Sequence, residues 1–138
     1  MYLVDTNVWL ERLLNQDKSD EVGRFLNHVS ARDLSVTDFT LHSICVILTR
    51  LTQSKVLLDF VQDVFVDGAV NLVSIKPRDT RLLVEVIDKY KLDFDDAYQY
   101  VAAEQNGLTI ISLDNDFDKT DKGRKTPAEI LRDVQDSE

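Results

Sequence analysis

Acidic side chains occur at three separate places along the chain. Asp5 and Asp114 each follow an apolar run, Asp116 comes two residues after Asp114, and Asp95 and Asp96 lie where a helical pattern begins. Each acid taken singly is explained as well by a helix start or a turn. If the set converges, its ionised carboxylates repel one another unless a cation lies between them. Mg²⁺ and Mn²⁺ prefer oxygen ligands, so either ion would suit such a group.

Apolar runs and helical periodicity predict the elements that carry these acids. Strands are predicted at Tyr2–Val4, Leu34–Thr37, Val70–Ile75 and Leu108–Leu113. Helices are predicted at about Asn7–Leu14, from Ser19 to Val29, at Asp38–Thr52, from Ser54 to Gly68, from Pro77 to Ile87, from Leu92 to Gly107, and from Pro127 to Val134. This alternation indicates an α/β fold with three α/β/α layers and a Rossmann-like parallel sheet of four or five strands. Acids that follow central parallel strands then meet at one edge of the sheet.

Residues at the predicted helix ends support these boundaries. Asn7 is the expected N-cap of the first helix, and Gly107 is expected to end the helix before the fourth strand. Thr126 and Glu129 flank Pro127 in the pattern of a capping box. One predicted helix has an apolar face that we expect to be buried, made of Leu41, Ile44, Cys45, Leu48 and Leu51.

Length, composition and charge limit the class of protein. The 138 residues, 43% of them apolar, predict a single domain over residues 1–138. No apolar run approaches the roughly 20 residues of a membrane span, and no signal peptide is visible. A single cysteine cannot form a disulfide framework. A cytoplasmic protein is therefore expected. A net charge of −9 argues against a surface that coats nucleic acid broadly, but it is compatible with a nuclease whose acids hold a metal.

In their order and spacing these motifs resemble the PIN-domain nucleases, and in particular the VapC-type toxins of toxin–antitoxin pairs. The similarity covers nearly the whole chain. The segment Leu3–Asn7 resembles the family's opening strand with its first acid, which is Asp5 here. Leu92–Ala97 resembles the segment with the third acid, at Asp96, and Ser112–Phe117 resembles the closing element, with the fourth acid at Asp114.

The resemblance implies a metal-dependent endoribonuclease that is the toxin of a type II pair. It implies that Asp5, Asp96 and Asp114 are catalytic and bind Mg²⁺ or Mn²⁺ with the help of Asp116, and that Thr6 orients Asp5 or a water. It further implies an RNA substrate, a cognate antitoxin and a homodimer. The helix from Val56 to Phe65 is apolar on more than one narrow stripe, so it is either deeply buried or partly covered by a second subunit.

One position departs from the family pattern. The family's second acid is usually a glutamate early in the third helix, and Ser43 occupies that place. Asp38 could substitute only if the helix begins later than predicted, because five residues place its side chain about 140° away. His42 is turned by about 100° and is expected to be a surface or packing residue. Ser43 therefore keeps a second hypothesis open, a catalytically silent PIN module that binds RNA or a protein partner.

A basic segment lies close to the last acids. It contains Lys119, Lys122, Arg124 and Lys125. Two interpretations remain open: these side chains bind the RNA backbone, or the segment is a solvated loop.

Overall fold

Four parallel strands form the centre of the computed structural model, which describes residues 1–136. The last two residues of the predicted 1–138 domain lie outside the described part. The strand order is β3-β2-β1-β4, and the strands span Tyr2–Val4 (β1), Leu34–Thr37 (β2), Asn71–Val73 (β3) and Thr109–Ile111 (β4). β1 pairs with β4 in register from Tyr2 opposite Thr109 to Val4 opposite Ile111. The segments that follow β1 and β4 therefore begin side by side at the carboxyl edge of the sheet.

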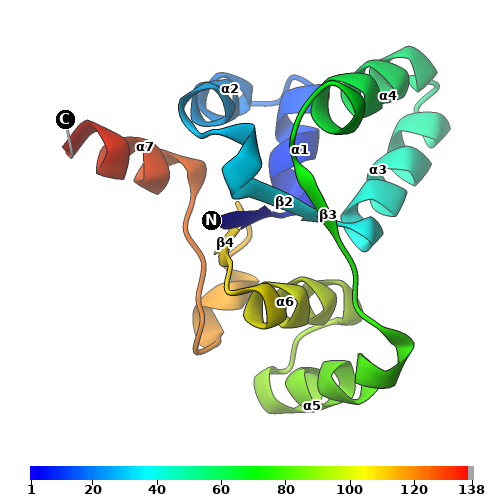
Figure 1. The fold of residues 1–138 in the computed structure, drawn as a ribbon, viewed down its shortest axis with the longest axis vertical. Coiled ribbons are helices and arrows are strands. Elements are labelled where there is room, and N and C mark those ends of the chain that lie inside the picture. The colour runs from blue at the N-terminus through cyan, green and yellow to red at the C-terminus, as the bar shows by residue number, and fades with distance from the viewer. Residues whose placement is uncertain (137–138) are drawn as a thin grey trace.

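Helices cover both faces of this sheet, which confirms the three-layer α/β/α arrangement (Figure 1). α1 to α4 lie on one side, with α7 beside α2, and α5 and α6 lie on the other. The helices span Thr6–Leu13 (α1), Ser19–His28 (α2), Asp38–Arg50 (α3), Ser54–Val61 (α4), Thr80–Tyr90 (α5), Phe94–Asn106 (α6) and Pro127–Asp136 (α7). Within residues 1–136, none of them has the length and apolar character required to cross a bilayer.

The core is divided between the two faces by the alternation of side chains along each strand. In β1, Leu3 packs with α6 residues while Val4 packs with α1 and α2. In β4, Ile110 and Ile111 divide in the same way. Both central strands are apolar on both faces because helices cover each of them. This burial on both sides sets the register of the strands and fixes the point at which each strand ends.

Several predicted boundaries differ from the structure in instructive ways. β3 is shorter than the predicted Val70–Ile75, because it is an edge strand and its Leu72 remains 53% exposed. α3 ends at Arg50, and Leu51 is 49% exposed instead of belonging to a buried face. α4 is followed by a π-helical turn, Gln62–Val66, before Gly68.

The N-cap of α1 is Asp5, not the predicted Asn7. The Asp5 carboxylate accepts a hydrogen bond from the backbone N–H of Thr6, at 2.8 Å, so the helix begins one residue earlier than expected. The two other capping predictions are confirmed. Gly107 ends α6 in the left-handed conformation at φ 62°, and Thr126 and Glu129 exchange the two hydrogen bonds of a capping box.

Candidate metal centre

An open cavity lies at the carboxyl edge of the central strands. It has a volume of about 250 Å³ and is lined by three of the predicted acids, Asp5, Asp96 and Asp114, together with Ser43. We call this cavity the acid pocket. β1 positions Asp5, the first turn of α6 positions Asp96, and the segment after β4 positions Asp114. The parallel sheet thus brings together residues that are far apart in the sequence.

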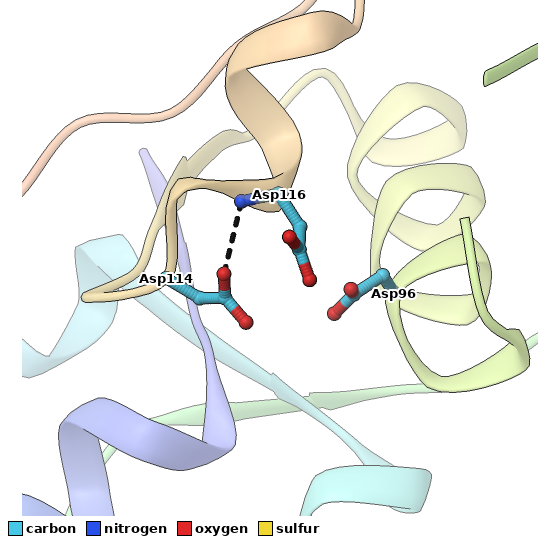
Figure 2. Close-up of side chains that lie close together, drawn as sticks. All are labelled: Asp96, Asp114 and Asp116. Atoms are coloured by element: carbon cyan, nitrogen blue, oxygen red, sulfur yellow. Dashed lines mark hydrogen bonds between the residues drawn. The ribbon is translucent and has the colours of Figure 1, made fainter. Parts of the chain in front are cut away.

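Three carboxylates lie within reach of a single cation. Asp96, Asp114 and Asp116 each offer an oxygen, and these oxygens all lie within 4.8 Å of one another. Their side chains point toward one another from α6 and from the segment after β4 (Figure 2). The backbone N–H of Asp116 donates to Asp114 Oδ1 at 2.9 Å, which holds the turn between the two acids. Oxygen ligands on opposite sides of Mg²⁺ are about 4 Å apart, so oxygens grouped within 4.8 Å are close to the spacing that a hard divalent cation requires.

The structure does not bring Asp5 into this group of three. Asp5 is 7% exposed, and hydrogen bonds occupy both of its carboxylate oxygens. Oδ1 accepts from the Thr6 N–H and from Gln99 Nε2, at 2.8 and 2.9 Å. Oδ2 accepts from Ser112 Oγ at 2.8 Å and from Asn7 Nδ2 at 3.3 Å. Asp5 therefore lies in the wall of the acid pocket, and its carboxylate is held in place by the four hydrogen bonds that it accepts.

Gln99 is the residue at this site that sequence reasoning missed. Its side chain is 2% exposed and lies among polar groups from three elements. Gln99 Oε1 accepts from the Thr37 hydroxyl at 2.9 Å, while Nε2 donates to Asp5 at 2.9 Å and to Thr40 Oγ1 at 2.6 Å. The one available signal was that Gln99 follows Asp96 by three residues and so shares its face of the helix.

Two other predicted residues support Asp5 from α1. The Thr6 hydroxyl bonds to Thr40 at 2.9 Å, so Thr6 reaches Asp5 through its backbone N–H and not through its side chain. Besides Asp5, the Asn7 amide donates to Ser112 Oγ at 3.2 Å and accepts from the backbone N–H of Leu113 at 3.1 Å. Asn7 therefore ties the ends of β1 and β4 together.

Burial and repulsion between carboxylates raise the pKa of two acids of the pocket, Asp5 and Asp96. Burial is the main cause that raises the pKa of Asp96 to about 8, and the neighbouring Asp93, Asp5 and Asp114 add to the effect. Burial also raises the pKa of Asp5, although hydrogen bonds from Gln99 and Ser112 oppose this. A divalent cation would compensate this charge, so the electrostatics of the acid pocket agree with the oxygen donor set.

The two alternative positions for the second acid are clearly separated in space. Ser43 lines the acid pocket, whereas Asp38 does not. α3 begins at Asp38, with Thr37 as its N-cap, so the helix does not start later than predicted. The Asp38 carboxylate accepts from the Tyr98 hydroxyl at 2.7 Å and lines a neighbouring hollow together with His42. Asp38 is therefore not a substitute acid in this geometry.

Most of the predicted basic cluster has partners within the protein. Arg124 bonds to Asp118 and to the backbone oxygen of Ser112. Lys125 pairs with Asp133 at 3.1 Å, and Lys119 donates to a backbone oxygen at 3.0 Å. Lys122 is exposed. Assignment of the cluster to RNA binding stays a prediction, and these contacts show that much of its charge is already used to hold the loop.

The fold and the site together define a three-layer α/β/α domain with an acidic pocket at the carboxyl edge of its central parallel strands. The family model of the PIN domain matches residues 2–123, and the chain belongs to the PIN domain family.

Solved structures share this fold at low sequence identity. A toxin–antitoxin complex from Klebsiella pneumoniae is 20% identical with a TM-score of 0.74, and the match covers 92% of this chain and 98% of that chain. FitAcB from Neisseria gonorrhoeae is 20% identical with a TM-score of 0.75, covering 93% and 99%. Mycobacterium tuberculosis VapC20, a Sarcin-Ricin loop cleaving toxin, is 15% identical with a TM-score of 0.72, covering 86% and 93%. No curated protein matches the sequence.

Proposed function

We propose that this protein is a metal-dependent endoribonuclease and the toxin of a type II toxin–antitoxin pair. The observation that carries the proposal is the group of three carboxylate oxygens within 4.8 Å of one another at the edge of the sheet. Membership of the PIN family and likeness in fold to a toxin that cleaves RNA support it. The likeness to a toxin–antitoxin complex supports an antitoxin as the natural partner.

The residues of the acid pocket have different roles in the proposed reaction. Asp96, Asp114 and Asp116 would hold Mg²⁺ or Mn²⁺. A bound ion of this kind would supply an activated water and stabilisation of negative charge on a phosphate. Asp5 lines the same pocket and is held by Gln99 in one orientation, which keeps the wall of the pocket fixed.

A cleavage assay tests the proposal directly. We expect the purified protein to cut single-stranded RNA with Mg²⁺ or Mn²⁺ and to lose this activity in EDTA. Asp114→Asn should reduce the rate at least a hundredfold, because it replaces a charged carboxylate ligand with a neutral amide. Asp88→Asn changes an exposed acid of α5 and serves as the matched control. Metal-independent RNA binding without cleavage would instead support the silent PIN module.

Ser43 offers a test of how the acid pocket tolerates the loss of one family acid. Ser43→Glu places a carboxylate in the pocket wall, so Mn²⁺ should bind more tightly, by about tenfold, and the cleavage rate should rise. Isothermal titration with Mn²⁺ measures the affinity. Asp38→Asn should leave it unchanged, because Asp38 lies outside the pocket. A loss of Mn²⁺ affinity in Asp38→Asn would mean that the ligand set is wrong.

A homodimer is the second part of the proposal. Phe60 is buried on α4, but Leu58 is 70% exposed, and Val66 in the turn after the helix is 64% exposed. Light scattering should therefore give the mass of a dimer at tens of micromolar protein. Leu58→Asp should shift the mass to that of a monomer, while Lys55→Asp, on the same helix, should not. A monomer for the unmodified chain would reject the dimer.

A further inference from the structure

A second hollow adjoins the acid pocket. Asp38, Phe39, His42 and Tyr98 line it, and its volume is about 470 Å³. We call it the aromatic hollow. Phe39 lines the acid pocket as well, so a single ring forms the boundary between the two. A molecule that extends from the acid pocket past Phe39 would enter the aromatic hollow next.

Aromatic rings gather at the hollow because two helices begin beside each other. Phe39 and Tyr98 line the hollow, and Phe94 lies beside both rings. Phe39 lies in the first turn of α3, and Phe94 and Tyr98 lie four residues apart on α6, where side chains share one face. The ring centres of Phe39 and Tyr98 are 5.5 Å apart, and those of Phe39 and Phe94 are 6.0 Å apart. Phe94 remains 47% exposed. The three rings thus form a small aromatic surface at the rim of a charged pocket.

The Tyr98 ring is held in place before any ligand arrives. Its hydroxyl donates to Asp38 Oδ1 at 2.7 Å and accepts from the backbone N–H of Ile75 at 3.1 Å. These bonds connect α6 to α3 and to the segment after β3. A ring fixed in this way loses little conformational freedom when a ligand stacks on it.

Polar groups of the hollow remain available to a ligand. Asp38 Oδ1 accepts from Tyr98 and from the Phe39 N–H, but Oδ2 makes no hydrogen bond within residues 1–136. The exposed His42 ring also has no hydrogen bond or ion pair in this range. The free carboxylate oxygen is exposed and can accept a hydrogen bond from a ligand. The aromatic hollow therefore offers flat apolar walls with one acceptor for a donor group.

We propose that the aromatic hollow binds an unpaired nucleobase of RNA, and that it selects bases with an exocyclic amino group. The proposal rests on RNA being the substrate of the acid pocket. The net charge of −9 repels the RNA backbone, so contacts that do not depend on charge are needed to bind RNA. Stacking of a base on aromatic rings is such a contact. The amino group of adenine, cytosine or guanine can donate to Asp38. Uracil has no amino group, and its single N3–H donor lies between two carbonyl oxygens that the carboxylate repels.

Fluorescence of 2-aminopurine in short single-stranded RNA tests the proposal with the whole chain. Titration in EDTA prevents metal-dependent cleavage, and stacking of the base on an aromatic ring quenches its emission. Phe94→Ala should weaken RNA binding about tenfold and reduce the quenching. Asp38→Asn should reduce the preference for oligoadenylate over oligouridylate, because an amide can both donate and accept. Two variants serve as matched controls. Val84→Ala changes a residue on α5 that is 53% exposed. Asp33→Asn changes the residue just before β2 begins, whereas Asp38 comes just after β2 ends.

The outcomes separate this proposal from the proposed nuclease. If RNA binds but Phe94→Ala and Asp38→Asn behave like the controls, the base site is refuted while the nuclease stands. A preference for oligouridylate in the unmodified chain would also refute it. If the chain neither binds nor cleaves RNA, both proposals fall. Melting curves of each variant show that lost binding does not reflect unfolding.

Discussion

Mn²⁺ is expected to raise the melting temperature of this protein, and the rise should be larger near pH 8 than at mildly acidic pH. A ligand that binds only the folded state adds about 2.7 kcal/mol to the free energy of unfolding when it is present at a hundredfold excess over its Kd. The cation must displace the proton from Asp96, whose pKa is raised to about 8. The apparent affinity should therefore increase by up to about tenfold per pH unit and level off once Asp96 is ionised.

Without metal, the free energy of unfolding should fall as the pH rises. The folded protein keeps the Asp96 proton that the unfolded chain releases above the ordinary pKa of 3.8. The resulting stability is fully present below that value and is lost as the pH rises through about 8. Melting curves with and without Mn²⁺ over this range should therefore diverge as the pH increases.

Variants at two acids make the test specific to the site. Asp114→Asn should abolish the Mn²⁺-dependent rise, because Asp114 supplies one of the three grouped oxygens. Asp88→Asn should keep it, since Asp88 is an exposed acid on α5. A rise that is equal in both variants would show that Mn²⁺ binds elsewhere, and no rise in the unmodified chain would contradict the metal centre.

Gln99→Leu is expected to lower the free energy of unfolding by roughly 2–4 kcal/mol. Leucine is close to glutamine in size, so the loss would come from hydrogen bonds that buried polar groups no longer make. The Gln99 side chain serves three of them, on Asp5, Thr37 and Thr40. Each is buried, and a lost hydrogen bond costs about 0.5–1.5 kcal/mol, or about 1.5–3 kcal/mol where the partner is charged, as Asp5 is when ionised. Urea unfolding, followed by circular dichroism, measures the change.

The same helix supplies the control. Gln105→Leu replaces an exposed glutamine that donates to Asp79 at 3.1 Å, and it should change the free energy of unfolding by less than about 0.5 kcal/mol. If the Gln99→Leu variant is as stable as the unmodified protein, water or a rearranged Asp5 side chain replaces the hydrogen bonds that Gln99 makes. The role assigned to Gln99 in fixing Asp5 would then be wrong.

The sequence by itself determined the fold class and most of the elements. Strands and helices alternate in a way that local periodicity reveals, and the end of α6 at Gly107 follows from its freedom to adopt a positive φ. It also placed the acids of the site correctly at one edge. Asp114 follows β4, and Asp96 begins the helix that leads back to β4, so both lie at the carboxyl edge of the parallel sheet.

Only the tertiary structure decided how each acid is held. From the sequence, Asp5 looked like one more member of the acidic group. In the structure the group consists of Asp96, Asp114 and Asp116. The Asp5 carboxylate lies outside it and accepts a hydrogen bond from Gln99, 94 residues away in the sequence. A pattern of apolar and polar residues shows which face of a helix is buried, but not which polar groups meet there. Those pairings depend on packing between elements, because each buried donor or acceptor must find its partner from whichever segment the fold brings within about 3 Å.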